Sequence, residues 1–251
     1  MQTKGINNKN WHGILKIFRL RLFIWILFSI QIAACAPSLY SVNMKYEPST
    51  VLRRTDISDA SKSKYLVTVA TWEDSRKIPD HMVLGHVTKV DGRKIPVLPK
   101  YLTAQDAITS GVKKHLSQSG YTVSGNNPAW NLNSDSIRSD WGDIVVGGSI
   151  DQLEVICRNE LLAKEYESKV GITIYFADVR NKRIFYKTSA LSSGSFGHFI
   201  FSEEKLESLL NDTLAHAIEK VFEGVNVEQK ILDAMTKRSS EKAVSSDSDS
   251  E

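Results

Sequence analysis

The N-terminal segment constrains the rest of the chain most, because it has the order of a secretory signal peptide. Residues 1–21 carry Lys and Arg but no acid, and the apolar run Leu22–Ile32 comes directly after them. Small residues and a cysteine, Ala33-Ala34-Cys35, then end the segment, as they do before a cleavage site. A helix of this run spans only about half of a ~30 Å hydrocarbon core. We therefore expect residues 1–34 to be removed and the fold to be built from residues 35–251.

The last four residues of this segment, Ile32-Ala33-Ala34-Cys35, resemble the lipobox of bacterial lipoproteins. The resemblance implies that Cys35 carries a thioether-linked diacylglycerol and, after cleavage, an N-terminal fatty acid; no other cofactor is expected. Two or more acyl chains hold a protein stably on a bilayer, whereas one chain binds marginally. Ala36 stands where an Asp would favour the inner membrane, so the resemblance implies the periplasmic face of the outer membrane.

Two alternatives to lipidation remain open for the N-terminal segment. One is a cleaved secretory signal with an incidental cysteine. The other is an uncleaved anchor helix that starts near Ile14, which would place Arg19 and Arg21 inside the bilayer. Arginines near the centre of a membrane helix cost about 2.5–3.5 kcal/mol each, which disfavours this alternative.

The charge of the mature chain argues against a nucleic-acid partner. The whole sequence has 32 basic and 29 acidic side chains, a formal charge of +3. Five of the basic residues and none of the acidic ones lie in residues 1–34, so the remainder has a charge of −2. A basic face on the folded domain, which nucleic-acid binding requires, is not indicated.

Composition and periodicity divide the mature chain into four parts. Residues 35–64 are polar and predict a lipidated N-terminus with a tether, although Val42, Met44 and Tyr46 alternate and could instead form an edge strand. Residues 65–224 contain the periodic apolar segments of a folded domain. A short helix is expected over 225–237, and the Ser-rich and acidic tail 238–251 is expected to be disordered.

The domain is predicted to be α+β, with a mixed, mostly antiparallel sheet of about five strands and two amphipathic helices on one face. The apolar periodicity predicts strands at 65–72, 83–98 (a hairpin), 121–123, 143–157, 170–176 and 183–190, and helices at 103–120 and 202–224. The apolar phase changes within strand 143–157, which predicts a bulge near Gly147-Gly148.

Several of these segments together resemble YajG-type outer-membrane lipoproteins over residues 62–224. The resemblance is carried by Glu73-Asp74-Ser75-Arg76 after the first strand, Val83-Leu84-Gly85, the helix end Ser119-Gly120-Tyr121, and the strand Asp143–Gly147. It implies an outer-membrane lipoprotein, and that family has no catalytic signature to carry over.

Two groups of residues come close to enzymatic motifs but lack the required spacing or residues. Glu73, Asp74, His81 and His86 are the best metal candidates, but the spacing of the two histidines fits neither a zincin nor a structural zinc site, so no metal is expected. The segment Gly194–His198 lacks the first glycine of a nucleophile elbow and ends an antiparallel strand. We therefore expect a loop there and no catalytic residue.

Three further side chains bear on function. Cys157 is expected to be a buried apolar residue, because a lone cysteine on a strand usually packs in a core. Trp130 and Trp141 lie in the polar loop 125–142, where they could anchor a partner or fold back onto the domain.

These observations together predict a non-enzymatic envelope lipoprotein that is bound to the membrane by its lipid anchor. Its domain would bind an envelope protein or a cell-wall component, or serve a structural role. The alternatives are an accessory subunit of an envelope export or transport assembly, and an envelope hydrolase with dispersed catalytic residues.

Overall fold

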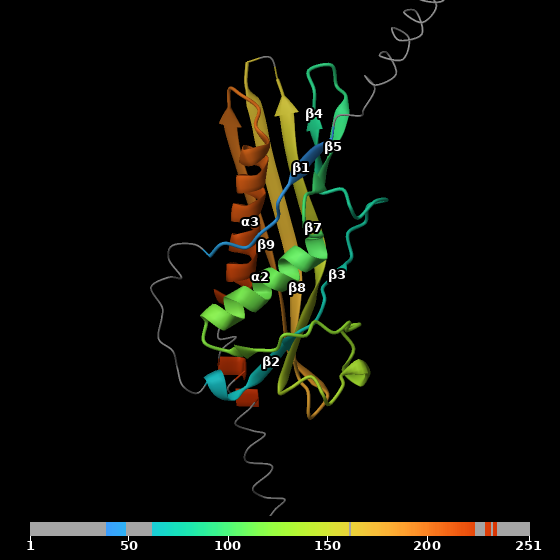
Figure 1. Ribbon diagram of the computed structural model, residues 1–251, viewed down its shortest axis with the longest axis vertical. Helices are drawn as coiled ribbons and strands as arrows, with labels where there is room; N and C mark the ends of the chain where they lie inside the picture. The colour runs from blue at the N-terminus through green and yellow to red at the C-terminus, as the bar shows by residue number, and fades with distance from the viewer. Residues whose placement is uncertain (1–38, 49–61, 161, 224–228, 232, 235–251) are drawn as a thin grey trace, which may run out of the picture. The chain divides into compact units, whose positions relative to one another are not determined.

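Three long strands dominate the sheet in the computed structural model, two of them inside the sheet and the last of the three at its edge (Figure 1). They are β7 (Ile144–Asn159), β8 (Lys164–Asp178) and β9 (Arg183–His198), which pair antiparallel as two successive hairpins. Strand β9 continues through Gly194–His198, so the loop predicted there is wrong. These residues pair with β8, with Ser195 opposite Glu167.

The structure describes residues 39–48, 62–160, 162–223, 229–231 and 233–234. They belong to the unit that begins at Leu39. Residues 1–34, Cys35 and the tail 238–251 lie outside the described residues. Of the predicted helix 225–237, residues 229–231 and 233–234 are helical, and Ile231 is buried.

The other edge of β7 is shared by three short parallel strands. The remaining strands are, in chain order, β1 (Tyr40–Val42), β2 (Leu66–Val69), β3 (Glu73–Asp74), β4 (Gly85–Thr88), β5 (Lys94–Pro99) and β6 (Thr122–Val123). β2, β3 and β4 pair with β7 in succession; β5 and then β1 extend the sheet beyond β4, and β6 extends it beyond β2.

The sheet therefore has nine strands, and the prediction of about five was wrong. The strand at 121–123 was predicted and is β6. Of the others, β3 was not predicted and β1 was left as an alternative, because they are two and three residues long, too short to show a clear alternation. The α+β class is confirmed. The sheet is mixed and mostly antiparallel, because the two longest ladders are antiparallel.

Both long helices, α2 (Ala104–Gln118) and α3 (Glu203–Glu223), cover one face of this sheet (Figure 1). The Thr103 hydroxyl accepts the Asp106 amide and caps the start of α2, and Gly120, with φ of +92°, lies just beyond its end. On α3 the buried leucines recur at helical spacing, with Leu206, Leu210 and Leu214 facing the sheet. Short 3-10 turns occur at Lys62–Lys64 and Ser134–Ser136.

The bulge in β7 lies at Asp151, not at the glycines. The register with β8 shifts between Ile150 and Gln152. The Asp151 carboxylate accepts hydrogen bonds from the hydroxyls of Ser149 (2.7 Å) and Thr173 (2.6 Å), which holds the extra residue in place.

Residues 39–48 are part of the domain, which corrects the predicted tether over that stretch. β1 pairs with β5, and Val42, Met44 and Tyr46 are buried in the core. The alternative edge strand is thus the arrangement observed. It forms because the alternating apolar side chains can be buried only against the sheet and α3.

Candidate functional site

The loop with the two candidate tryptophans is folded onto the sheet face opposite the helices. Trp130 and Trp141 are only 5% and 7% exposed. They pack with a small second cluster of apolar residues that includes Val145, Ala177 and Val179. The Trp130 indole N–H donates to the Asn133 carbonyl at 2.9 Å. Of the two alternatives left open for Trp130 and Trp141, folding back onto the domain is the arrangement observed, and neither ring is exposed to act as a partner anchor.

A cleft of about 590 Å³ lies beside the bulge. Its walls come from the connection between β3 and β4, from β4 and β5, and from β7 around the bulge. The residues that line it are Arg76, Lys77, Ile78, Pro79, Asp80, Val83, Leu84, Gly85, His86, Lys94, Pro96, Asp151, Gln152, Leu153 and Glu154. Apolar walls with a few charged groups are typical of binding sites of this size.

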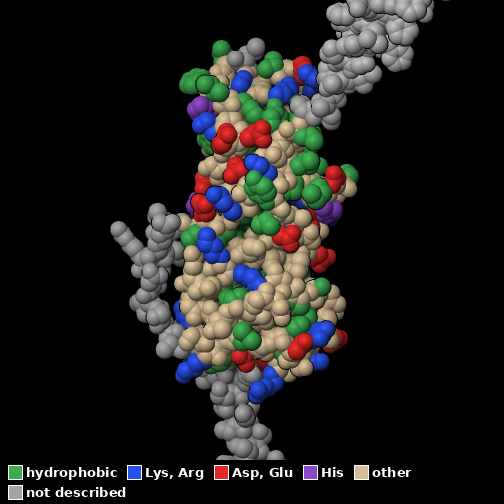
Figure 2. All heavy atoms as spheres, in the orientation of Figure 1, with side chains coloured by type: hydrophobic (Ala, Val, Ile, Leu, Met, Phe, Trp, Pro, Cys, Tyr) green, Lys and Arg blue, Asp and Glu red, His purple; other side chains and the backbone are tan. Residues whose placement is uncertain are grey.

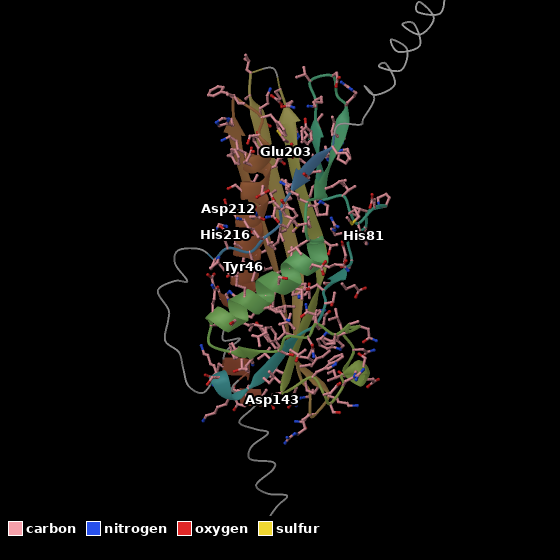
Figure 3. The ribbon with its side chains drawn as sticks, viewed as in Figure 1. Tyr46, His81, Asp143, Glu203, Asp212 and His216 are labelled. Atoms are coloured by element: carbon pink, nitrogen blue, oxygen red, sulfur yellow. The ribbon has the colours of Figure 1, made fainter. Side chains whose placement is uncertain are left out.

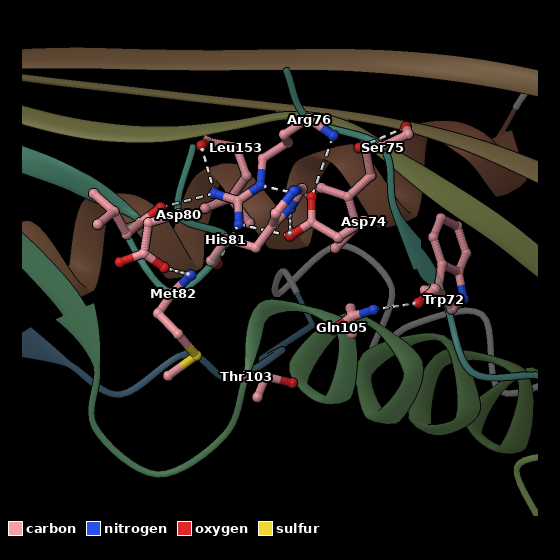
Figure 4. A network of polar contacts seen from close by, with 12 residues as sticks. Trp72, Asp74, Ser75, Arg76, Asp80, His81, Met82, Thr103, Gln105 and Leu153 are labelled. Atoms are coloured by element: carbon pink, nitrogen blue, oxygen red, sulfur yellow. Dashed lines mark hydrogen bonds and ion pairs between the residues drawn. The ribbon is translucent and has the colours of Figure 1, made fainter. Parts of the chain in front are cut away.

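The wall formed by the β3–β4 connection is fixed by one buried arginine (Figure 4). The Arg76 guanidinium donates Nε to Asp74 Oδ1 (2.8 Å) and Nη2 to Asp74 Oδ2 (2.6 Å). It also donates to three backbone carbonyls, those of His81 (2.6 Å), Val83 (3.0 Å) and Leu153 (3.4 Å). Because all three nitrogens are engaged, Arg76 holds the loop against β7 and has little capacity left to bind an anion.

His81 adds an ion-pair geometry to the same carboxylate. Its Nδ1 lies 3.1 Å from Asp74 Oδ2, and the side chain is 48% exposed. Burial by itself raises the pKa of Asp74, but the hydrogen bonds from Arg76 and His81 outweigh it and lower the pKa below its usual value. Asp74 therefore stays ionised at neutral pH.

The other candidate metal ligands do not converge on this pair. His86 lies on β4 and lines the cleft, and its pKa is lowered by burial and then by the charge of Lys94. Glu73 is an exposed residue of β3. Within the described ranges, no group of three or more His, Cys, Asp or Glu side chains is placed to hold a metal ion.

The serine motif does not form a nucleophile elbow. Ser195 and His198 both lie within β9, and no helix starts directly after Ser195. The His198 ring is held by the backbone of Ile200, since its Nδ1 lies 3.0 Å from the Ile200 carbonyl oxygen and 3.1 Å from the Ile200 amide nitrogen. Cys157 is buried in the core, and burial raises the pKa of its thiol, as expected for a packing residue.

One group of functional side chains was missed by sequence reasoning. Glu203 and Glu207 on α3 accept the backbone amides of Ser41 (3.0 Å) and Asn43 (2.8 Å). One turn further, Asn211 accepts the Lys45 amide at 3.0 Å and donates to the Asn43 carbonyl at 3.0 Å. We call Glu203, Glu207 and Asn211 the α3 clamp.

The α3 clamp bonds backbone groups of residues 41–45 that a neighbouring strand would otherwise bond. Figure 3 shows Glu203 near the start of α3. The signal in the sequence was the spacing of three polar residues at i, i+4 and i+8 beside an apolar stripe. The role of these residues could not be predicted from that spacing, because the backbone groups they bond lie more than 160 residues away in the sequence.

A buried polar cluster fixes Tyr46, just after the residues that the α3 clamp holds. The Tyr46 hydroxyl lies 3.0 Å from Nδ1 of His115 on α2, and the His115 ring stacks on Phe222 of α3 with a centroid distance of 4.3 Å. Burial and then the nearby Glu219 carboxylate raise the pKa of Tyr46. Burial lowers the pKa of His115 to about 4, so it is neutral at pH 7.

In the part of the chain that the structure describes, no helix combines the length and the apolar character needed to cross a membrane.

No protein-family model and no curated protein matches this chain. Solved structures that share its fold in part include protein XCC0632 from Xanthomonas campestris, described with the family model DUF330. That structure is 9% identical, has a TM-score of 0.47, and is aligned over 79% of this chain and 99% of its own.

Two bacterial lipoproteins are also among the similar structures. Lipoprotein GNA1162 from Neisseria meningitidis is 14% identical with a TM-score of 0.34, over 59% of this chain and 94% of its own. A minor lipoprotein from Acinetobacter baumannii is 13% identical with a TM-score of 0.34, over 66% and 92%.

Proposed function

We propose that this chain is a bacterial envelope lipoprotein that is anchored through Cys35 to the periplasmic face of the outer membrane and binds a partner without catalysing a reaction. The observation that carries this is the lipobox-like Ile32–Cys35, which lies only four residues before β1. The α3 clamp then holds the residues from Ser41 to Lys45 on the domain. A lipid on Cys35 would thus tie the whole domain closely to the membrane.

The cleft beside Arg76 is the binding site that the geometry supports best. Val83 and Pro96 offer partly exposed apolar surface in front of the buried Leu84 and Leu153. Both signs of charge surround it through Lys77, Asp80, Lys94 and Glu154. This lining suits a protein segment with apolar and charged side chains better than a uniformly charged ligand. An envelope protein is the partner class we propose, either alone or within an export or transport assembly.

One observation favours a second candidate, an envelope hydrolase. The His81 ring is half exposed, and its Nδ1 is oriented by the buried carboxylate of Asp74, as in acid–base catalysis. The hydrogen bonds of the described residues place no serine or cysteine on His81. The binding function is therefore the better supported of the two.

Lipidation is tested by metabolic labelling with a fatty acid. The wild-type chain should take up the label, and Cys35→Ala should lose it and accumulate as precursor. The buried Cys157→Ala serves as the matched control and should keep the label. Label retained by Cys35→Ala would contradict the lipoprotein assignment.

Binding and catalysis are separated by complementation of a deletion strain, with the amount of protein measured for each variant. Glu154→Lys, which reverses a charge of the cleft, should impair the envelope phenotype, whereas His81→Gln should not. Arg138→Glu changes an exposed side chain outside the cleft and is the control. A folded and abundant His81→Gln variant without function would instead support the hydrolase.

A further inference from the structure

One end of the domain exposes large apolar side chains from four separate segments. Leu162 is 87% exposed, Phe199 82%, Ile200 70%, Val90 61% and Leu39 53%. We call these five residues the apolar crest. Leucine, isoleucine and phenylalanine are rarely gathered on a protein surface without a partner.

The sheet register brings the four segments of the apolar crest to the same end. Lys164 pairs with His198, so the β7–β8 turn with Leu162 and the chain after β9 lie together. Thr88 pairs with Arg158, which places the tip of the β4–β5 hairpin there too. Figure 1 shows these turns at the top of the view, and Figure 2 shows apolar side chains gathered at that end.

The entry of the chain into the domain lies at this end as well. Tyr40, the first residue of β1, packs on Phe201 with a ring-centroid distance of 4.8 Å. Its hydroxyl is hydrogen-bonded by Lys89 from the β4–β5 hairpin. Leu39, which directly precedes β1, therefore belongs to the apolar crest at the point where the described chain begins.

The backbone beneath the apolar crest is held by an aromatic support. The Tyr166 ring stacks on Phe196 at 4.7 Å, and its hydroxyl donates to the Ile200 carbonyl at 3.3 Å. The same hydroxyl accepts the Ser202 amide at 3.0 Å. Phe199 and Ile200 thus project from a segment that is fixed on both sides, and they are not free to turn into the core.

We propose that the apolar crest inserts into the surface of the bilayer that holds the lipidated Cys35. This inference rests on the proposed function, because it takes the lipid anchor as given. From Cys35 to Tyr40 the chain is five residues long, which spans at most about 18 Å when fully extended. A domain held on so short a connection presents the end with Leu39 and Phe199 to the membrane.

The chemistry of this end fits a lipid surface. Apolar side chains on amphipathic surfaces enter the boundary between headgroups and acyl chains to a depth of about 5–10 Å. Lys89 and Lys164 flank the apolar crest in sequence, and each ammonium makes one hydrogen bond within the domain, to the Tyr40 hydroxyl and the Glu160 carbonyl. An ammonium has three donors, so each retains capacity for a lipid phosphate at the level of the headgroups. Docking on the bilayer would bury the apolar crest and fix the orientation of the cleft relative to the membrane.

The test uses the full lipidated chain in vesicles of phosphatidylethanolamine and phosphatidylglycerol. An environment-sensitive fluorophore is attached to Phe199→Cys, and in a second variant to Leu162→Cys. The chain has only two native cysteines, of which Cys157 is buried and Cys35 would carry lipid. Arg138→Cys, at an exposed site in the loop between β6 and β7, is the control. Fatty-acid labelling of each variant verifies the anchor independently.

The expected result is a blue shift at positions 199 and 162, quenching by doxyl lipids, and loss of quenching by aqueous iodide, with none of these at position 138. Iodide access at 199 and 162 in a protein that carries the fatty-acid label would overturn the insertion and leave the anchor standing. Protection from iodide without doxyl quenching would show that a protein or a second copy covers the apolar crest, which also overturns it. Absence of the fatty acid would overturn the proposed function itself.

Discussion

Gly147 on β7 lies flat against the indole ring of Trp130, on the sheet face opposite the helices. A Cβ atom at position 147 would lie 2.6 Å from Trp130 Cε3, closer than such atoms approach. A Cβ atom at Gly148 would lie 2.2 Å from the Thr173 carbonyl oxygen and 2.6 Å from the Trp72 ring on the helix face. The glycine pair therefore provides room for one tryptophan on each face of a single strand.

The first prediction concerns this contact. Gly147→Ala should lower the free energy of unfolding by about 1–3 kcal/mol, because the loop with Trp130 has to move away from β7. Urea unfolding and the emission of the tryptophans measure the change. Gly197→Ala on β9 is the matched control, since its Cβ meets nothing within 4 Å. Equal stability of the two variants would contradict the packing of the loop.

The second prediction concerns the α3 clamp. Glu207→Ala leaves the Asn43 amide without its acceptor, so it should cost about 1–3 kcal/mol and speed hydrogen exchange of that amide. Glu207→Gln keeps an acceptor and should cost less. Asp212→Ala, on the exposed side of α3, is the control and should have little effect (Figure 3). Unchanged exchange in Glu207→Ala would show that the hydrogen bond is not formed in solution.

The third prediction tests the packing of α3 on the sheet. Leu214 is fully buried in the main core, so Leu214→Ala should lower the free energy of unfolding by about 2–5 kcal/mol. The exposed Ser208→Ala should change it little. Thermal melting that is identical in the two variants would mean that this side of the helix does not face the sheet.

The long elements were predictable because their apolar periods extend over many residues. Helix α2, with its cap at Thr103, and the strand that begins near Ile144 carry clear local signals. A change in the alternation of apolar residues predicted a bulge in this strand. Gly147-Gly148 and Asp151 lie so close together that the alternation alone could not decide which of them forms it. The hydrogen bonds that Asp151 accepts from Ser149 and Thr173 decide its place.

The sites were harder to predict, because non-local contacts assemble them. β1 is three residues long, and its stability comes from β5 and from Glu203 and Glu207 near the other end of the chain. The cleft exists because the bulge and the Arg76-bound loop meet, and neither feature indicates a cavity on its own. The sequence could not decide whether Trp130 and Trp141 are exposed or folded back, because their neighbours in the chain are polar and the ring contacts that bury them come from β7 and beyond.

The last prediction concerns His115, the buried ring between Tyr46 and Phe222. Its pKa is about 4 in the folded chain against an ordinary value of 6.5, because burial disfavours the imidazolium. Below pH 6.5 the unfolded chain binds a proton that the folded chain does not. The stability is therefore complete above pH 6.5 and falls by about 3 kcal/mol as the pH drops to 4.

His86, whose pKa is also lowered by burial and by Lys94, contributes a loss of stability in the same pH window, so the comparison of variants isolates the part due to His115. The lowered pKa of Asp74 acts only below its usual value of 3.8, where the stabilisation by Arg76 is lost as the pH falls further. His115→Gln removes the titrating ring, so its urea midpoint should change less between pH 6.5 and pH 4 than that of the wild type. His216→Gln on the exposed face of α3 is the control and should keep the wild-type slope. If the urea midpoint of His115→Gln depends on pH as steeply as that of the wild type, the acid sensitivity arises from groups other than His115.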